Sequence, residues 1–200
     1  MGHLHGPVTS NVLVLALSYC WTRRDHPDPD GRTLADVCEF LEYLEASRHF
    51  ETGNKHKIGD KELVIFWDFP ALYQNLSPWP EDDTVRREED SRTEAQLERF
   101  KRGLRSVNLW YAHVETWVIL ATHAYRTTPY LSSGWPFFEF LTSQLIKDAD
   151  LAIDLPTALA WIRRTGMDPL ESKRNRSIYW LFFRGLPPGC TAAAPAPAQV

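Results

Sequence analysis

The sequence VLVLALSYCW, from Val12 to Trp21, decides the fold. Its first six residues, Val12 to Leu17, are all apolar and place no polar side chain on either face. A run this short and this apolar is typical of a strand that helices cover on both sides, as in a parallel sheet. Ligands of open α/β sheets bind outside the carboxyl ends of such strands. We therefore expect Ser18, Tyr19 and Trp21 to lie beside a ligand crevice.

Other apolar runs predict further strands of the same sheet. LVIFWDF, from Leu63 to Phe69, is β-branched and aromatic and ends in Asp68 just before the breaker Pro70. A third strand is expected within residues 115–121. Helices are predicted to begin at about residue 33 and to span about 81–105, 135–147 and 156–164, with a short strand at 151–153. Strands that alternate with helices predict an α/β fold with βαβ units.

Two of the predicted helices have an expected core face, and a third is expected to be solvated. The helix that begins near residue 33 should bury a stripe at helical spacing, which is Leu34, Val37, Cys38, Leu41 and Leu44. In the helix at 135–147, Ser133 is the expected N-cap, Pro136 suits the first turn, and the apolar face is Phe137, Phe138, Leu141, Leu145 and Ile146. The densely charged segment 81–105 should be a surface helix with pairs such as Glu98 and Arg102.

The length and composition predict one globular domain. The chain has 200 residues, of which 44% are hydrophobic and 12% aromatic. We assign residues 1–10 to a flexible lead, 11–184 to a single α/β domain and 185–200 to a flexible tail that is rich in Ala and Pro. The aromatic segment IYWLFF at 178–183 is expected to be an edge strand or a docking segment.

Charge and cysteine content narrow the partners and the compartment. The net charge is −4 and no basic stripe stands out, so nucleic acid is not an expected partner. Three scattered cysteines predict reduced thiols in the cytoplasm, and neither a signal peptide nor a membrane-spanning segment is recognisable. The seven histidines do not cluster, so neither a metal nor a cofactor is expected.

Glu139 is the carboxylate with the most suggestive surroundings. Phe138 and Phe140 flank it, and Trp135 lies four residues earlier, on the same helix face. A carboxylate beside aromatic rings can stabilise an oxocarbenium-like ribosyl cation while a ring stacks on the departing base, which is the chemistry of cleaving an N-glycosidic bond. The alternative is a Glu in the first turns of the helix that only complements the helix dipole.

The polar residues at the predicted strand ends also allow two interpretations each. Asp68 either orients a ribose hydroxyl or caps the turn before Pro70. Ser18 and Tyr19 either bind a ligand or form hydrogen bonds that close the crevice. For Trp21, the alternatives are stacking on a ligand and packing in the core.

Four ordered motifs resemble the heterokaryon-incompatibility (HET) domain and, more distantly, the Toll/interleukin-1 receptor (TIR) domain. ALSYCW at 16–21 is similar to the HET opening motif, and FWDFPALYQN at 66–75 to the second, with Asp68 followed by Gln74 six residues on. FKRGLRSVNLWYAHVETWVIL at 100–120 is similar to the third. SGWPFFEF at 133–140 resembles the Trp-xxx-Glu motif of both families.

The resemblance implies an open, mainly parallel, flavodoxin-like sheet and a role in self-recognition, innate immunity or stress signalling. In TIR enzymes the Glu of Trp-xxx-Glu is the catalytic residue of NAD cleavage, and its position corresponds to Glu139. We therefore expect an NAD-hydrolysing enzyme in which Trp21 and Trp135 form an aromatic wall. Self-association or TIR/HET-like partner domains are also implied. The alternatives are a non-catalytic interaction module of the same fold and, more weakly, an enzyme like the nucleoside deoxyribosyltransferases.

Overall fold

Four parallel strands form one sheet in the computed structural model, which describes residues 11–23, 25–47, 58–78, 90–122, 125, 129–147 and 151–165. The strands are β1 (Val12–Tyr19), β2 (Glu62–Phe66), β3 (Trp117–Ala121) and β4 (Ala152–Asp154). The helices are α1 (Arg32–Ser47), α2 (Asp68–Ala71), α3 (Glu94–Ser106), α4 (Asn108–Ala112), α5 (Gly134–Ile146) and α6 (Leu155–Thr165), with a 3₁₀ turn η1 (Tyr130–Ser132). The strand order β2-β1-β3-β4 is that of a flavodoxin-like sheet, so the predicted fold class is confirmed.

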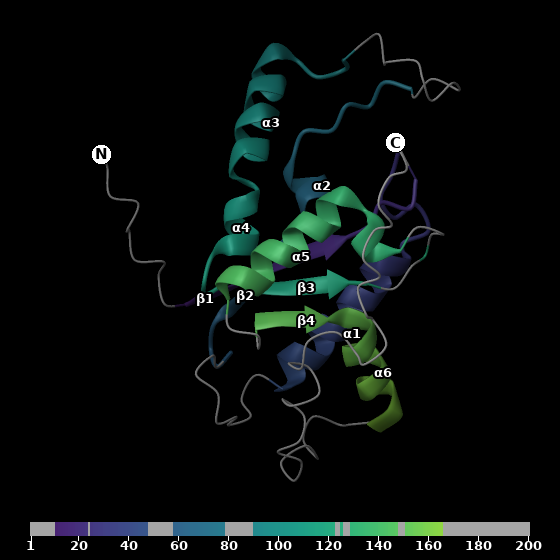
Figure 1. The fold of residues 1–200 in the computed structure, drawn as a ribbon, viewed down its shortest axis with the longest axis vertical. Coiled ribbons are helices and arrows are strands. Elements are labelled where there is room, and N and C mark those ends of the chain that lie inside the picture. The colour runs from purple at the N-terminus through teal and green to yellow at the C-terminus, as the bar shows by residue number, and fades with distance from the viewer. Residues whose placement is uncertain are drawn as a thin grey trace, which may run out of the picture.

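Helices cover both faces of the sheet (Figure 1). Alternate residues of β1 point to opposite faces. Leu13, Leu15 and Leu17 belong to the larger core, which α1 and α6 complete. Ala16 faces the other side, where it joins a smaller core with Tyr111 of α4. Because both faces of β1 are buried, the strand needs apolar residues at nearly every position, which explains the run that the sequence shows.

The position of β1 between β2 and β3 places its carboxyl end at the point where the strand order reverses. In the sheet register, Leu15 pairs with Ile65 on one side and with Trp117 on the other. The chain passes from β1 to β2 on one side and then crosses back to β3 on the other. A crevice opens at such a switch point because the two connections leave the sheet in opposite directions.

The second predicted strand ends earlier than its sequence suggests. β2 stops at Phe66, and Asp68 is the first residue of the short helix α2 rather than the last residue of a strand. Pro70 lies inside this helix, where the first turn tolerates proline because its backbone N–H would have no partner there. The predicted strand at 63–69 is therefore wrong at its carboxyl end.

The core face of α1 also differs from the predicted stripe. Leu34 is 48% exposed and Cys38 is exposed, whereas Asp36 is buried. The Asp36 carboxylate turns inward because it accepts hydrogen bonds from Tyr125 Oη (2.5 Å) and from a guanidinium nitrogen of Arg163 (2.9 Å). The buried residues of the helix are Thr33, Asp36, Val37, Phe40, Tyr43 and Leu44.

α5 shows the largest departure from the predicted pattern. All five residues of its expected core face are exposed, and the residues that it buries are Pro136, Glu139 and Ser143. Glu139 points inward to a buried polar partner, because Ser18 donates a hydrogen bond to it. The Ser143 hydroxyl donates to the Phe140 carbonyl one turn earlier in the same helix. The predicted apolar face of this helix is its outer surface.

α3 begins at Glu94, later than the predicted start near residue 81. Thr93 and Gln96 form a capping box, in which each side chain accepts a hydrogen bond from the backbone of the other. Glu98 pairs with Lys101 at 3.0 Å rather than with the predicted Arg102. The helix buries none of its residues, so the expectation of a solvated surface helix is confirmed for the described part.

Several predicted features lie outside the described residues. They are the lead at 1–10, the start of the charged segment 81–105, the aromatic segment 178–183 and the tail 185–200. Among the described residues, no helix has the length and apolar character needed to cross a membrane.

Candidate active site

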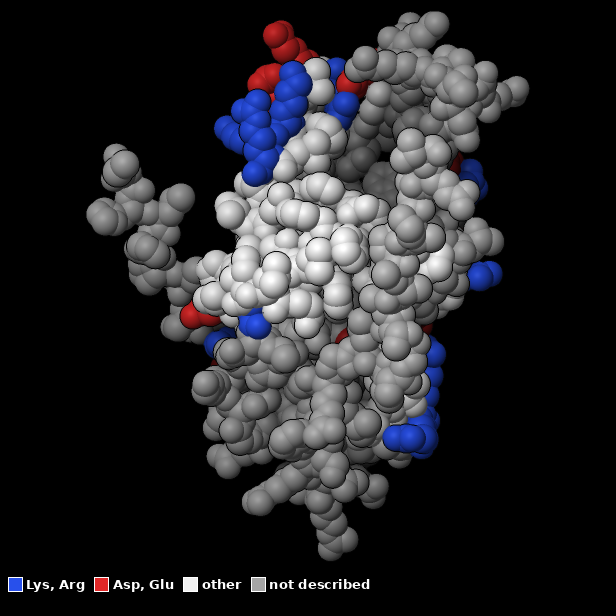
Figure 2. All heavy atoms as spheres, in the orientation of Figure 1, with Lys and Arg blue, Asp and Glu red and all other residues white. Residues whose placement is uncertain are grey.

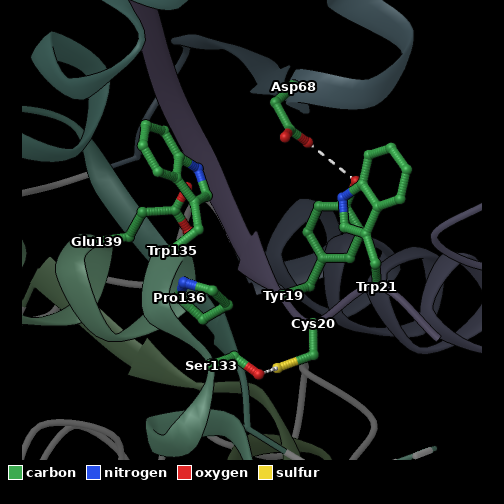
Figure 3. Close-up of a pocket in the computed structure, with 8 residues that line it drawn as sticks. All are labelled: Tyr19, Cys20, Trp21, Asp68, Ser133, Trp135, Pro136 and Glu139. Carbon is green, nitrogen blue, oxygen red and sulfur yellow. Dashed lines mark hydrogen bonds between the residues drawn. The ribbon is translucent and has the colours of Figure 1, made fainter. Parts of the chain in front are cut away.

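A cavity of about 360 Å³ lies at the carboxyl end of β1, at the switch point of the sheet (Figure 3). Three segments build it. The chain leaving β1 supplies three consecutive residues, α2 supplies Asp68, and the first turns of α5 with its N-cap supply the rest. The lining residues are Tyr19, Cys20, Trp21, Asp68, Ser133, Trp135, Pro136 and Glu139.

Glu139 is held at the base of this cavity by a chain of buried hydroxyl groups. Its side chain projects from the second turn of α5 toward the sheet, and the residue is only 2% exposed. Ser18 Oγ donates a hydrogen bond to Glu139 Oε2 at 2.5 Å. Tyr130 Oη lies 2.5 Å from the same Ser18 Oγ. Because the small Ser18 occupies the strand position below α5, the carboxyl group has room to reach the sheet.

The surroundings of Glu139 raise its pKa to about 8, and burial is the main cause. The negative charge of Asp68 raises the pKa further. The hydrogen bond from Ser18 acts in the opposite direction but does not compensate. At neutral pH this carboxyl group is therefore mostly protonated, and a positive charge in the cavity would favour its ionisation.

Asp68 is fixed by two hydrogen bonds to one oxygen. Tyr19 Oη donates to Asp68 Oδ1 at 2.9 Å, and the backbone N–H of Phe69 donates to the same oxygen at 2.7 Å. Burial raises the pKa of Asp68, while these two donors lower it. Burial also raises the pKa of Tyr19, with a further contribution from the charge of Asp68. The carboxylate thus holds the start of α2 and orients the Tyr19 phenol while it lines the cavity.

Changing Tyr19 to Phe removes one of the donors that stabilise the Asp68 carboxylate, so the pKa of Asp68 should rise further. Carboxyl ¹³C NMR titration of the folded protein measures this directly. A Tyr73→Phe variant is the matched control, because Tyr73 lies in an exposed loop outside the cavity. An unchanged or lowered pKa of Asp68 in Tyr19→Phe would contradict the role of this hydrogen bond.

Aromatic rings form two walls of the cavity. Trp21 packs edge-on against Phe69, with ring centroids 5.5 Å apart. Trp135 is 45% exposed, and its ring stacks on Phe138 at 5.9 Å. Both indoles contact neighbours and line the cavity, so their orientation is fixed while one surface stays available to a ligand.

The eight lining residues include two carboxyl groups and no Lys, Arg or His. Such a lining suits a flat ring or an organic cation, which aromatic faces and carboxylates both attract. It offers no side-chain cation to a phosphate. In the described part of the chain, no three His, Cys, Asp or Glu side chains lie close enough together to hold a metal ion.

The structure brings five of the six sequence-predicted site residues to the cavity lining. They are Tyr19, Trp21, Asp68, Trp135 and Glu139. Ser18 is fully buried beneath Glu139 and does not line the cavity, so it positions the carboxyl group instead of meeting a ligand directly.

Sequence reasoning missed Cys20, Ser133 and Pro136 of the lining, and Tyr130, which contacts Ser18 behind it. Cys20 donates a weak hydrogen bond from Sγ to Ser133 Oγ at 3.4 Å. Cys20 could have been predicted, because it lies between Tyr19 and Trp21 in the sequence. Tyr130 contacts a residue 112 positions away, and no local pattern marks that contact.

Comparison with known proteins adds no family assignment. No family model, no curated protein and no solved structure matches the chain. The geometry of the cavity and the four motifs of the sequence are therefore the features that bear on function.

Proposed function

We propose that this chain is a HET/TIR-like cytoplasmic signalling domain that hydrolyses the N-glycosidic bond of NAD. The observation that carries the proposal is the buried Glu139 carboxyl group at the base of a cavity walled by Trp21 and Trp135. The Trp-xxx-Glu spacing within SGWPFFEF agrees with it. The sheet supports it as well, because a switch point is where nucleotides bind in open α/β folds.

The charge of the cavity fits a pyridinium leaving group. In NAD the nicotinamide ring carries a positive charge, and the lining provides carboxyl groups and aromatic faces but no side-chain cation. The pyridinium charge would lower the pKa of Glu139 and so produce the carboxylate that the reaction needs. The phosphates would extend out of the cavity, away from Asp68 and Glu139.

The proposed reaction breaks the bond between ribose C1′ and the nicotinamide nitrogen. The bonding electrons move to the ring nitrogen, so nicotinamide leaves as a neutral base without needing a proton. The ionised Glu139 stabilises the positive charge that develops on the ribosyl group. A water oxygen then bonds to C1′, and its proton passes to solvent or to the Glu139 carboxylate. Tyr19 and Asp68 would contact the ribose hydroxyls, and Ser18 would hold Glu139 in place.

The test is NAD consumption by the full chain at high protein concentration, with and without a crowding agent. Glu139→Gln keeps the shape of the side chain but cannot ionise, so turnover should fall on the order of a hundredfold or more. Glu115→Gln is the matched control, since Glu115 is exposed and does not line the cavity. Equal and negligible turnover by all three folded proteins would overturn the proposal.

A non-catalytic interaction module is the second candidate. The observation that favours it is the exposed apolar surface of α5, where Phe138, Leu141 and Leu145 face solvent. Such a module would assemble or signal equally well with Glu139→Gln. A transferase like the nucleoside deoxyribosyltransferases would differ in its products: labelled free nicotinamide would exchange into the nucleotide pool, whereas a hydrolase would leave it free.

A further inference from the structure

Two carboxyl groups line the candidate cavity, and their charge determines which ligands suit it. Figure 3 shows Glu139 with Trp135 on one side of the cavity and Asp68 with Tyr19 on the other. Burial raises the pKa of Glu139, and the negative charge of Asp68 raises it further, so the field of Asp68 extends across the cavity. A ligand between the two groups therefore lies in a negative electrostatic potential.

The cations of the described residues do not offset this potential. Arg23 is the described cation nearest to the lining residues in the sequence, and it pairs with Asp25 through hydrogen bonds of 3.0 and 2.7 Å. Figure 2 shows Lys and Arg side chains gathered over α3, and no residue of that helix lines the cavity. A negatively charged part of a ligand would therefore meet two carboxyl groups and no cation among the described lining residues.

The cavity has room for a nucleoside but for little more. Its volume of about 360 Å³ is near the lower end of the roughly 300–1,000 Å³ that is typical of small-molecule sites. A base stacked on an indole and a ribose between the carboxyl groups would occupy this space, so a 5′-phosphate would lie at its mouth. The phosphate would then be one ribose ring from the bond that breaks at Glu139. That separation is within the Debye length, which is about 8 Å at physiological salt.

A phosphate at the mouth weakens binding, and a positively charged base strengthens it. A phosphate monoester carries a charge of about −1.5 to −2 at pH 7, and salt screens its repulsion by Asp68 only partly at this separation. The same carboxylate attracts the pyridinium ring of nicotinamide, as do the aromatic faces of Trp21 and Trp135. Both effects favour a cationic nucleoside that has a free 5′-hydroxyl group.

We propose that this site takes a pyridinium nucleoside without a 5′-phosphate, such as nicotinamide riboside, in preference to the mononucleotide and to NAD, and that Asp68 sets the preference. The inference rests on the proposed cleavage of a pyridinium glycosidic bond at Glu139, and it narrows the substrate class of that reaction. Asp68 suits this role because Tyr19 and the backbone N–H of Phe69 hold its carboxylate in place in the lining. NAD remains a substrate, but the weaker one.

Calorimetric titration of the full chain carrying Glu139→Gln tests the preference, because this variant should not consume the ligand during the titration. Asp68 is then the one carboxyl group among the eight lining residues, so a comparison of ligands reports its charge. At about 50 mM salt, nicotinamide riboside should bind at least about tenfold more tightly than nicotinamide mononucleotide, which differs from it by the phosphate alone. At about 0.5 M salt the ratio of the two affinities should fall to about threefold or less.

Asp68→Asn, added to the same chain, should lower this ratio at least about threefold. Asn keeps an oxygen that can accept both hydrogen bonds, but it carries no charge. Asp60→Asn is the matched control, since Asp60 is exposed and precedes β2 at the amino end of the sheet, opposite the cavity. It should leave the ratio unchanged. The salt series needs no change at Asp68, so it tests the role of charge even where Asp68→Asn does not fold.

Three outcomes overturn the proposal. They are a mononucleotide that binds as tightly as the riboside, a site that binds neither ligand, and a folded Asp68→Asn protein with an unchanged ratio. The titrations measure no turnover, so they separate this inference from the proposed function. Cleavage of NAD by the wild type without a preference for the riboside would leave the function standing alone. Selective binding of the riboside without any turnover would leave the preference standing alone.

Discussion

Changing Glu139 to Gln should stabilise the fold at alkaline pH by up to roughly 5 kcal/mol, even though it removes the proposed catalytic carboxylate. The reason is the raised pKa of Glu139, which is about 8 in the folded protein against an ordinary value of 4.5. Between these two pH values the folded chain holds a proton that the unfolded chain has lost. The free energy of unfolding therefore decreases as the pH rises through this window, and it becomes independent of this group above pH 8.

The measurement is chemical unfolding of both proteins from about pH 5 to about pH 9. Gln cannot ionise, so the difference in unfolding free energy between Glu139→Gln and the wild type isolates the contribution of this carboxyl group. The difference should grow from about pH 5 to about pH 8 and then level off. Glu115→Gln serves as the control, because this Glu is exposed, and its difference should stay near zero. A Glu139→Gln difference that is flat with pH would contradict the burial argument.

At Glu139 the proposed activity and the stability of the fold favour different protonation states. The reaction needs the ionised carboxyl group, and the fold favours the neutral form because Glu139 is buried near Asp68. Active sites often keep groups that are unfavourable for the folded state, since their chemistry depends on them. A purely structural Glu at this position would bring the same penalty with no compensating role. Gln would then be the better residue for the fold.

The sheet could be predicted from the sequence because its strands obey a local rule. Strands such as β1 and β3 are covered on both faces, so they must be apolar at nearly every position, and the printed sequence displays this directly. The boundaries are less predictable. Asp68 belongs to α2 because the backbone N–H of Phe69 binds its carboxylate, a local contact that the strand pattern conceals.

The orientation of α5 could not be predicted from its hydrophobic pattern. The pattern assumes that the apolar side of a helix faces the core and the polar side faces water. Here Glu139 and Ser143 face inward, where Ser18 donates to Glu139, and Phe138 and Leu145 face outward. The inversion places the candidate catalytic group inside and the candidate interface outside.

Strand-end positions and sequence motifs predicted most of the candidate site, but not the contacts that hold it together. Trp135 and Glu139 are four residues apart in one helix, so helical geometry alone brings both to the cavity. Ser18 and Tyr130 are brought together by the fold over 112 positions, and a single sequence carries no record of that contact.

Changing Lys147 to Met should remove a rise in the free energy of unfolding that the wild type shows above pH 8. Lys147 follows α5 and is only 8% exposed, and its ammonium group donates hydrogen bonds to the His113 and Thr116 carbonyls. Burial lowers the pKa of this lysine from 10.5 to about 8. Between these values the unfolded chain holds a proton that the folded chain has released, so the free energy of unfolding increases as the pH rises through the window.

Glu139 of α5 and Lys147, which follows that helix, therefore affect the free energy of unfolding in opposite directions on the two sides of pH 8. The contribution of Glu139 falls toward that pH, and the contribution of Lys147 rises beyond it. Chemical unfolding is measured from about pH 7 to about pH 10. The unfolding free energy of Lys147→Met should decrease relative to that of the wild type only above pH 8. Lys101→Met, on the exposed surface of α3, should show no such trend. A constant difference between Lys147→Met and the wild type would mean that the ammonium group keeps its proton in the fold, because the two carbonyl acceptors then outweigh its burial.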